Sequence, residues 1–305
     1  MIDRVVVVYN AHSGSLAGEG DASPVDRLQL LFNQRGVTAR LLEFDPDTIA
    51  TELRAVLVDA PQAVLVAGGD GTVLAVAGVL LDADVPLGIL PGGTMNVLAR
   101  DLDIPLDIEV ALDALLPGET AQIDIARVNG APFLCSSLVG LMPHLGRLRE
   151  EARGSRNPLH MAGLLLRSLR TARRYPRLRV SLTVDGVLQR VHTRAIMVSN
   201  NPFCGKAALL PRRDAIDLGR LALYVTRDRS LWDLVRTGVE LARGQWPPRD
   251  RLIEVQGTVI EIDIDGTGLT SVMSDGEARQ LQTPLVYTMS PGALTVLRPS
   301  GATGA

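Results

Sequence analysis

The N-terminal part of the chain alternates between short, uniformly apolar runs and longer segments with helical hydrophobic spacing. Runs that are apolar throughout are typical of strands buried on both faces of a sheet. Strands that alternate with helices predict βαβ units around a parallel sheet. The predicted strands are residues 5–9, 38–44, 63–66 and 87–90, and the predicted helices are residues 24–34, 48–58, 72–81, 95–100 and 108–116.

After Gln122 the pattern changes to alternating apolar and polar residues. Asn129-Gly130 and Asp185-Gly186 supply hairpin turns between such runs. Regular short strands with turn signals indicate an antiparallel sandwich. The predicted fold is an α/β domain with a parallel sheet at residues 1–125, followed by a mainly antiparallel β-sandwich domain at 126–305. The predicted strands there are residues 123–128, 179–184, 187–193, 195–200, 221–225, 258–264, 271–274, 285–289 and 294–297, with helices near 158–174 and 230–243.

Two glycine-rich turns each join a predicted strand to a predicted helix. The first is Gly68-Gly69-Asp70-Gly71-Thr72, with its helix opening at Thr72, and the second is Gly92-Gly93-Thr94, followed by Asn96. Glycine lets backbone N–H groups approach an anion, and a helix N-terminus favours negative charge. Both turns are expected at the carboxyl edge of one sheet, where α/β folds bind ligands.

Asp70 lies in the middle of the first turn, where its carboxylate would repel a phosphate. A carboxylate in that position is suited to holding Mg²⁺ against the phosphates. The alternative is a tight structural turn in which Asp70 is a capping residue. A third polar loop, with Asn10, Ser13 and Gly14, follows the first strand; it is either part of the same site or an ordinary loop with a serine cap.

The motifs GGDGT and LGILPGGTMN resemble the catalytic-domain signature of the diacylglycerol kinase and sphingosine kinase superfamily, and more narrowly the bacterial soluble lipid kinases. The resemblance implies a nucleotide-binding domain followed by a β-rich domain for the lipid. The implied activity is transfer of phosphate from ATP, with Mg²⁺, to the hydroxyl of a diacylglycerol-like or long-chain, sphingoid-type lipid, in lipid metabolism such as phospholipid biosynthesis. The nucleotide-binding residues would be Asn10, Ser13, Gly14, Gly68, Gly69, Asp70, Gly71, Thr72, Gly92, Gly93, Thr94 and Asn96.

The resemblance also implies the catalytic residues. Ser274-Asp275-Gly276-Glu277 matches the family's Asp-Gly-Glu, which makes Glu277 the expected general base and Asp70 its partner through the metal. Asp217 is a second expected metal ligand. Without this resemblance, Glu277 reads as an exposed hairpin residue.

Two departures from the family pattern leave alternatives open. Val97 stands where an acid is usual after the second glycine turn, and Leu218 stands beside Asp217 where a second Asp is expected. A catalytically weak or inactive lipid- or nucleotide-binding protein of the same fold is therefore the alternative. Nicotinamide nucleotide kinases share GGDGT, but their second-domain motif has no counterpart in this sequence.

Composition is that of an ordinary globular protein, with 46% hydrophobic residues and a net charge of −3. We find no signal peptide and no apolar stretch of the ~18–20 residues that a membrane span needs. We therefore expect a cytoplasmic protein without a nucleic-acid partner. Cys135 and Cys204 lack metal or disulfide spacing.

Residues 147–179 contain ten arginines and only two acidic residues, within an otherwise acidic chain. In the predicted helix at 158–174, leucines fall on one face and Arg167, Arg170 and Arg174 on another. This pattern is typical of a helix that lies on an anionic membrane. The alternative is that the leucines pack on the β-domain while the arginines are merely solvated.

Overall fold

The computed structural model describes residues 2–14, 23–152, 158–203, 212–213, 215–227, 233, 236, 240 and 251–301. The chain divides into two compact units. The N-terminal unit comprises Met1–Ile125, Ala215–Asp217 and Pro291–Ala305, and the C-terminal unit comprises Ala126–Asp214 and Leu218–Ser290. The predicted second domain, 126–305, thus includes two segments that belong to the N-terminal unit.

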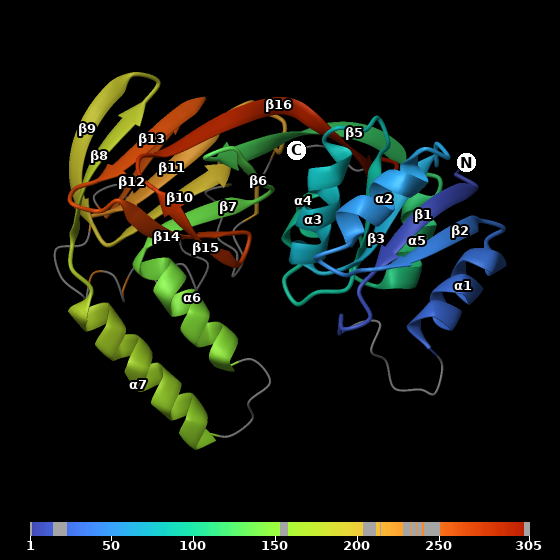
Figure 1. The fold of residues 1–305 in the computed structure, drawn as a ribbon, viewed down its shortest axis with the longest axis horizontal. Coiled ribbons are helices and arrows are strands. Elements are labelled where there is room, and N and C mark those ends of the chain that lie inside the picture. The colour runs from blue at the N-terminus through green and yellow to red at the C-terminus, as the bar shows by residue number, and fades with distance from the viewer. Residues whose placement is uncertain are drawn as a thin grey trace. The chain divides into compact units, whose positions relative to one another are not determined.

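The N-terminal unit is built from strands that alternate with helices (Figure 1). Ser23 caps the first helix by accepting a hydrogen bond from Val25 N–H, and Asp107 caps α5 in the same way. The elements are β1 (Arg4–Tyr9), α1 (Pro24–Gln34), β2 (Thr38–Glu43), α2 (Ile49–Leu57), β3 (Ala63–Gly68), α3 (Asp70–Leu80), β4 (Leu87–Pro91), α4 (Val97–Asp101) and α5 (Ile108–Leu115).

The strands of this unit form a parallel sheet in the order β2-β1-β3-β4. Every residue of β3 and β4 is buried, whereas β2 at the edge of the sheet alternates between exposed and partly buried positions. The apolar runs are therefore explained by burial on both faces. Because the strands are parallel, their carboxyl ends, and the turns that follow them, lie at one edge of the sheet.

The last strand of the chain, β16 (Leu285–Arg298), begins in the C-terminal unit and ends in the N-terminal unit. Val296 pairs with Leu87 of β4 in parallel. Strand β5 (Glu119–Val128) also passes from one unit to the other. Strands β5 and β16 therefore each contribute residues to both units.

The C-terminal unit contains two sheets, whose strands are mostly antiparallel. One contains β13, β8 and β9 beside the first half of β16, and the other has the order β12-β11-β10-β7-β14-β15. The remaining elements are β6 (Ala131–Phe133), β7 (Ser136–Gly140), α6 (Leu141–Ala152), α7 (Pro158–Arg174), β8 (Leu178–Val184), β9 (Val187–Thr193), β10 (Ala195–Asn200), β11 (Leu221–Thr226), β12 (Leu252–Gly257), β13 (Val259–Ile264), β14 (Leu269–Ser274) and β15 (Glu277–Gln282).

One apolar core joins the two sheets of this unit. It includes Phe133, Val198, Leu223, Ile260 and Tyr287, all almost completely buried. Helices α6 and α7 run side by side outside the sheets (Figure 1). The residues described give no helix long and apolar enough to cross a membrane.

The predicted fold class is confirmed, and several details of the sequence analysis are corrected. Helix α3 begins at Asp70 instead of Thr72. Helix α6 and strands β6, β7, β12 and β15 were not predicted. The two strands expected at 285–289 and 294–297 form one strand, β16, which continues through Pro291 because Gly292 takes a φ of 57° and its N–H bonds the Asp124 carboxylate at 2.9 Å. The helix predicted at 230–243 lies mostly outside the described residues.

Candidate functional site

The two glycine turns pack directly against each other in the N-terminal unit. A Cβ atom added to Gly93 would lie 2.7 Å from the Cα of Gly69, and one added to Gly92 would lie 3.1 Å from the Cα of Gly68. The N–H of Gly92 also donates to Gly68 O at 2.8 Å. Glycine is therefore required here because backbone approaches backbone, and the two turns form a single structure.

Asp70 locks the two turns together. Its Oδ1 accepts a hydrogen bond from the N–H of Val97 at 2.8 Å, which places a carboxylate at the beginning of α4. Burial raises the pKa of the Asp70 carboxyl, and the backbone N–H groups around Val97 partly offset this effect. We call the Asp70–Val97 hydrogen bond the latch. This hydrogen bond joins Asp70 to the start of a helix 27 residues further along the chain.

Two asparagines fix the shape of the surrounding loops. Asn96 has a φ of 49°, and its side-chain amide both accepts from Gly93 N at 2.9 Å and donates to Gly93 O at 2.8 Å. Asn10 donates to the hydroxyl of Thr72 at 3.2 Å, which connects the loop after β1 to helix α3. Three loops from three strands are therefore joined by hydrogen bonds and close contacts.

The side-chain hydroxyl of Ser13 is a buried polar group of these loops that has no hydrogen-bond partner in the described part of the chain. The residue is only 8% exposed, and its Oγ has no hydrogen-bond partner among the described residues. This hydroxyl faces the second turn, since a Cβ on Gly92 would lie 2.9 Å from Ser13 Oγ. Buried polar atoms are usually satisfied, so an unsatisfied hydroxyl beside glycine turns and the N-terminus of α3 indicates a site for an anionic ligand.

The other predicted residues of these loops have looser surroundings. Gly71 lies half-buried in the first turn of α3, whereas Gly14 and Thr94 are exposed. A Cβ on Gly14 would meet nothing within 4 Å. Nothing in the packing of Gly14 therefore requires glycine.

Glu277 is the first residue of β15, directly after a two-residue hairpin turn. Ser274 pairs with Glu277 across the turn, and Asp275 and Gly276 both have positive φ, at 49° and 91°. The Glu277 side chain is 51% exposed and its Oε2 lies 3.1 Å from Arg279 Nη2. An exposed ion pair of this kind contributes little to stability, so Glu277 is available to a ligand.

The structure describes no group of three or more acidic, histidine or cysteine side chains that could hold a metal ion. Asp217, the second expected metal ligand, is exposed in a loop of the N-terminal unit. The preceding residue, Ile216, accepts a hydrogen bond from the N–H of Asp124 at 2.9 Å. Asp124 is 1% exposed and was missed by the sequence analysis, because nothing local distinguishes it from any strand residue.

A set of long-range polar contacts in the described part of the C-terminal unit was also missed. Asp275 accepts hydrogen bonds from three consecutive N–H groups, those of Leu134, Cys135 and Ser136. Arg213, 2% exposed, donates to the carbonyl of Leu134. The Asp-Gly pair signals the turn in the sequence, but its partners are about 140 residues away along the chain.

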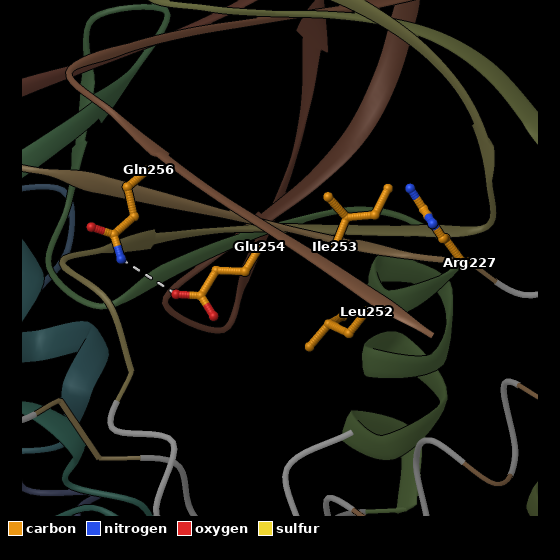
Figure 2. A pocket seen from close by; sticks show the side chains of 5 residues that line it. All are labelled: Arg227, Leu252, Ile253, Glu254 and Gln256. Carbon is orange, nitrogen blue, oxygen red and sulfur yellow. Dashed lines mark hydrogen bonds between the residues drawn. The ribbon is translucent and has the colours of Figure 1, made fainter. Parts of the chain in front are cut away.

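A hollow with a volume of about 410 Å³ lies in the C-terminal unit (Figure 2). It is lined by Arg227, the residue after β11, and by Leu252, Ile253, Glu254 and Gln256 of β12. Gln256 donates to Glu254 at 3.4 Å within it. None of the predicted site residues lines this hollow, and its mixed lining does not indicate a particular ligand.

Two family models match the chain. Residues 4–128 match the diacylglycerol kinase catalytic domain. Residues 146–298 match the model described as "YegS C-terminal NAD kinase beta sandwich-like domain". The two matches together cover most of the sequence, including the glycine turns and the Glu277 hairpin.

Individual proteins resemble the chain more distantly. A diacylglycerol kinase of Mycobacterium tuberculosis is 27% identical over 255 residues, 81% of this chain and 80% of the relative. An uncharacterized protein of Synechocystis sp. is 29% identical over 137 residues, and the match covers 45% of this chain but only 31% of that longer protein. The crystal structure of a diacylglycerol kinase from Bacillus anthracis shares the fold, with a TM-score of 0.70, 19% identity and 99% of each chain covered.

The contact between the turns gives a first prediction. Gly93→Ala places a methyl group against the Gly69 backbone, so the turns separate and unfolding free energy falls by about 1–3 kcal/mol. The sequence predicts that ATP binds at these turns, and we expect its affinity, measured by calorimetry, to fall roughly 10–100-fold because of an equal loss at the site. The matched control is Gly78→Ala in α3, where nothing lies within 4 Å; it leaves ATP affinity unchanged and raises stability by about 0.5–1 kcal/mol. Equal ATP affinity in both variants would contradict the prediction.

Proposed function

Because the chain belongs to the diacylglycerol kinase family, we propose that it transfers the γ-phosphoryl group of ATP to the hydroxyl of a diacylglycerol-like or long-chain lipid. The observation that carries the proposal is the buried hydroxyl of Ser13, which has no hydrogen-bond partner among the described residues and lies beside two glycine turns in backbone contact. That arrangement has the character of a phosphate site. Relatives carry the names diacylglycerol kinase and putative lipid kinase, and these names supply the acceptor class.

The phosphates of ATP are proposed to lie against the turns of the N-terminal unit. The first N–H groups of α3 have no acceptor within their own helix, and the helix begins beside Gly69. Ser13 supplies a hydroxyl, and Asn10 fixes the neighbouring Thr72. Gly68, Gly69, Gly92 and Gly93 have no side chains to exclude a phosphate, while Gly14, Gly71, Thr94 and Asn96 complete the loops around it.

Asp70 is proposed to have two roles, as the latch and as a metal ligand. Carboxylate oxygens are the ligands that Mg²⁺ prefers, and protein sites commonly supply one or two carboxylates while the nucleotide supplies the rest. Asp70 and Asp217 fit that requirement, and Mg²⁺ is expected to arrive mainly with ATP. When bound, it neutralises charge on the transferred phosphate.

Glu277 is proposed as the general base that accepts the proton of the lipid hydroxyl. Phosphoryl transfer needs positioning, charge stabilisation and a base near the attacking oxygen. An exposed carboxylate at the tip of a hairpin is available for such contact. The reaction forms the bond from the lipid oxygen to the γ-phosphorus, breaks the bond to ADP and leaves the proton on Glu277.

Helix α7 is proposed to contact an anionic membrane that holds the lipid. Leu166 is 48% exposed, and Arg167, Arg170 and Arg174 are exposed on the same helix. Leu164, in contrast, is 6% exposed and packs inward. An exposed leucine among arginines favours attachment to an anionic lipid surface.

The first test separates the two roles of Asp70. Asp70→Asn keeps an oxygen that can accept from Val97 N–H but removes the charge, whereas Asp70→Ala removes both. We expect Asp70→Asn to unfold at the wild-type temperature and to need roughly 10–100-fold more Mg²⁺ for half-maximal turnover. Asp70→Ala should be less stable as well. If Asp70→Asn were fully active at the Mg²⁺ concentration that the wild-type protein needs, Asp70 would have only its structural role in the latch.

The second test concerns Glu277. Transfer of ³²P from ATP is measured with a panel of diacylglycerol, sphingoid and other long-chain alcohols, with NAD included as a non-lipid acceptor. Glu277→Gln should lower kcat by roughly 10²–10⁴ with little change in ATP affinity. Glu261→Gln, an exposed strand glutamate of the same unit, is the matched control and should keep full activity. Wild-type protein that binds ATP but phosphorylates no acceptor would favour the non-catalytic alternative.

The third test is liposome flotation. The protein should float with anionic vesicles at low salt and less at high salt, because salt screens the arginines. Changing Arg167, Arg170 and Arg174 to Glu should abolish most of this binding. The control changes Arg27, Arg54 and Arg190, exposed on other elements, and alters net charge equally. Equal loss in both triple variants would show that net charge, rather than α7, governs attachment.

A further inference from the structure

The position of Glu277 depends on the hairpin turn that precedes it. The turn consists only of Asp275 and Gly276, and Glu277 follows at once. A two-residue turn with positive φ at both positions has little freedom. A shift of the turn therefore shifts the start of β15 and the side chain of Glu277 with it.

The tip of the hairpin is hydrogen-bonded to Leu134, Cys135 and Ser136, where the chain passes from β6 into β7. The Asp275 carboxylate accepts from the N–H groups of Leu134 at 2.5 Å, Cys135 at 2.9 Å and Ser136 at 3.0 Å. The N–H of Asp275 in turn donates to Ser136 O at 2.9 Å. Four hydrogen bonds thus join the tip to three consecutive residues, and we name this set the tip clamp.

Arg213 contacts the same segment through the carbonyl group of Leu134. Its Nη1 donates to Leu134 O at 2.7 Å and to Asn200 O at 2.8 Å. Asn200 Nδ2 also donates to Leu134 O, at 2.9 Å. The guanidinium lowers the pKa of the Asp275 carboxyl, whereas burial, the larger effect, raises it. The segment Leu134–Ser136 therefore accepts a hydrogen bond from the Arg213 guanidinium through a carbonyl group and donates hydrogen bonds to the Asp275 carboxylate through its N–H groups.

A second hairpin of the same unit is held at its tip by an exposed carboxylate, and it serves as a comparison for the tip clamp. Asp185-Gly186 joins β8 to β9 with positive φ at both residues, and the Asp185 carboxylate accepts from Thr258 N at 3.0 Å and Val259 N at 2.9 Å. Asp185 is exposed, and those N–H groups lower its pKa. The fold can therefore clamp a hairpin tip with a solvated carboxylate.

A buried Arg213 and a half-buried Asp275 are thus not needed for a stable turn, because charges withdrawn from water carry a desolvation cost that is often not recovered as stability. We propose that Asp275 and Arg213 are positioning residues, which hold the hairpin so that Glu277 meets the acceptor hydroxyl. This inference rests on the proposed role of Glu277.

The test compares Asp275→Asn with Asp185→Asn. Asparagine tolerates positive φ, so both variants keep the turn while the carboxylate is lost. Asp275→Asn should lower kcat about 10–100-fold, as expected for a catalytic group displaced by about 1 Å, with unchanged KM for ATP. Asp185→Asn should keep the wild-type kcat, although its melting temperature should fall by about as much as that of Asp275→Asn. Arg213→Lys, which keeps the charge but not the fork of donors, should give an intermediate loss of kcat.

A double-mutant cycle distinguishes failure of this inference from failure of the proposed function. Asp275→Asn should lower kcat in the wild-type background but not further in Glu277→Gln, since a positioning residue acts only through the residue it positions. Equal losses in both backgrounds, or equal kcat for Asp275→Asn and Asp185→Asn, would overturn the inference alone. An active Glu277→Gln would instead remove the proposed base, and the inference with it.

Discussion

The contact between Gly69 and Gly93 is the constraint on which the N-terminal unit depends. Two backbone turns can approach this closely only where neither residue has a side chain. Asp70 also joins the first turn to the residues that follow the second turn, because its carboxylate accepts a hydrogen bond from the N–H of Val97. The departure of Val97 from the family pattern leaves the latch intact, because any residue other than proline supplies that N–H.

Rigid backbone around an unsatisfied hydroxyl is a form of preorganisation. The loops after β1, β3 and β4 are tied together by Asn10, Asp70 and Asn96, and Ser13 Oγ remains without a described partner. A ligand that enters such a site does not need to order the loops, so less of its binding free energy is lost. In the C-terminal unit the hairpin tips are held in a similar way, because the side chains of Asn129, Asp185 and Asp275 each accept a hydrogen bond from an N–H group of a neighbouring strand.

Much of the fold could be predicted from the spacing of hydrophobic residues along the sequence. The fully buried strands β3 and β4 are apolar throughout, β1 is buried and mostly apolar after its first residue, and the hairpins at Asn129 and Asp185 carry their turn residues locally. Long-range pairing could not be read in this way. Asp275 and Leu134 are 141 positions apart, and Arg213 reads in the sequence as one more solvated arginine. The glycine motifs indicated the site, but which N–H each carboxylate accepts depends on packing that no local pattern encodes.

The passage of β16 from one unit to the other bears on how the protein is made. A ribosome delivers β1 to β4 first, then nearly all of the C-terminal unit, and only afterwards Val296 and Leu297, which are buried in the finished N-terminal unit. Until those residues emerge, the edge of β4 beside Leu87 lacks the strand that pairs with it. An unpaired edge is a template for adventitious strand pairing. The N-terminal unit therefore completes its sheet last, although most of it is translated first.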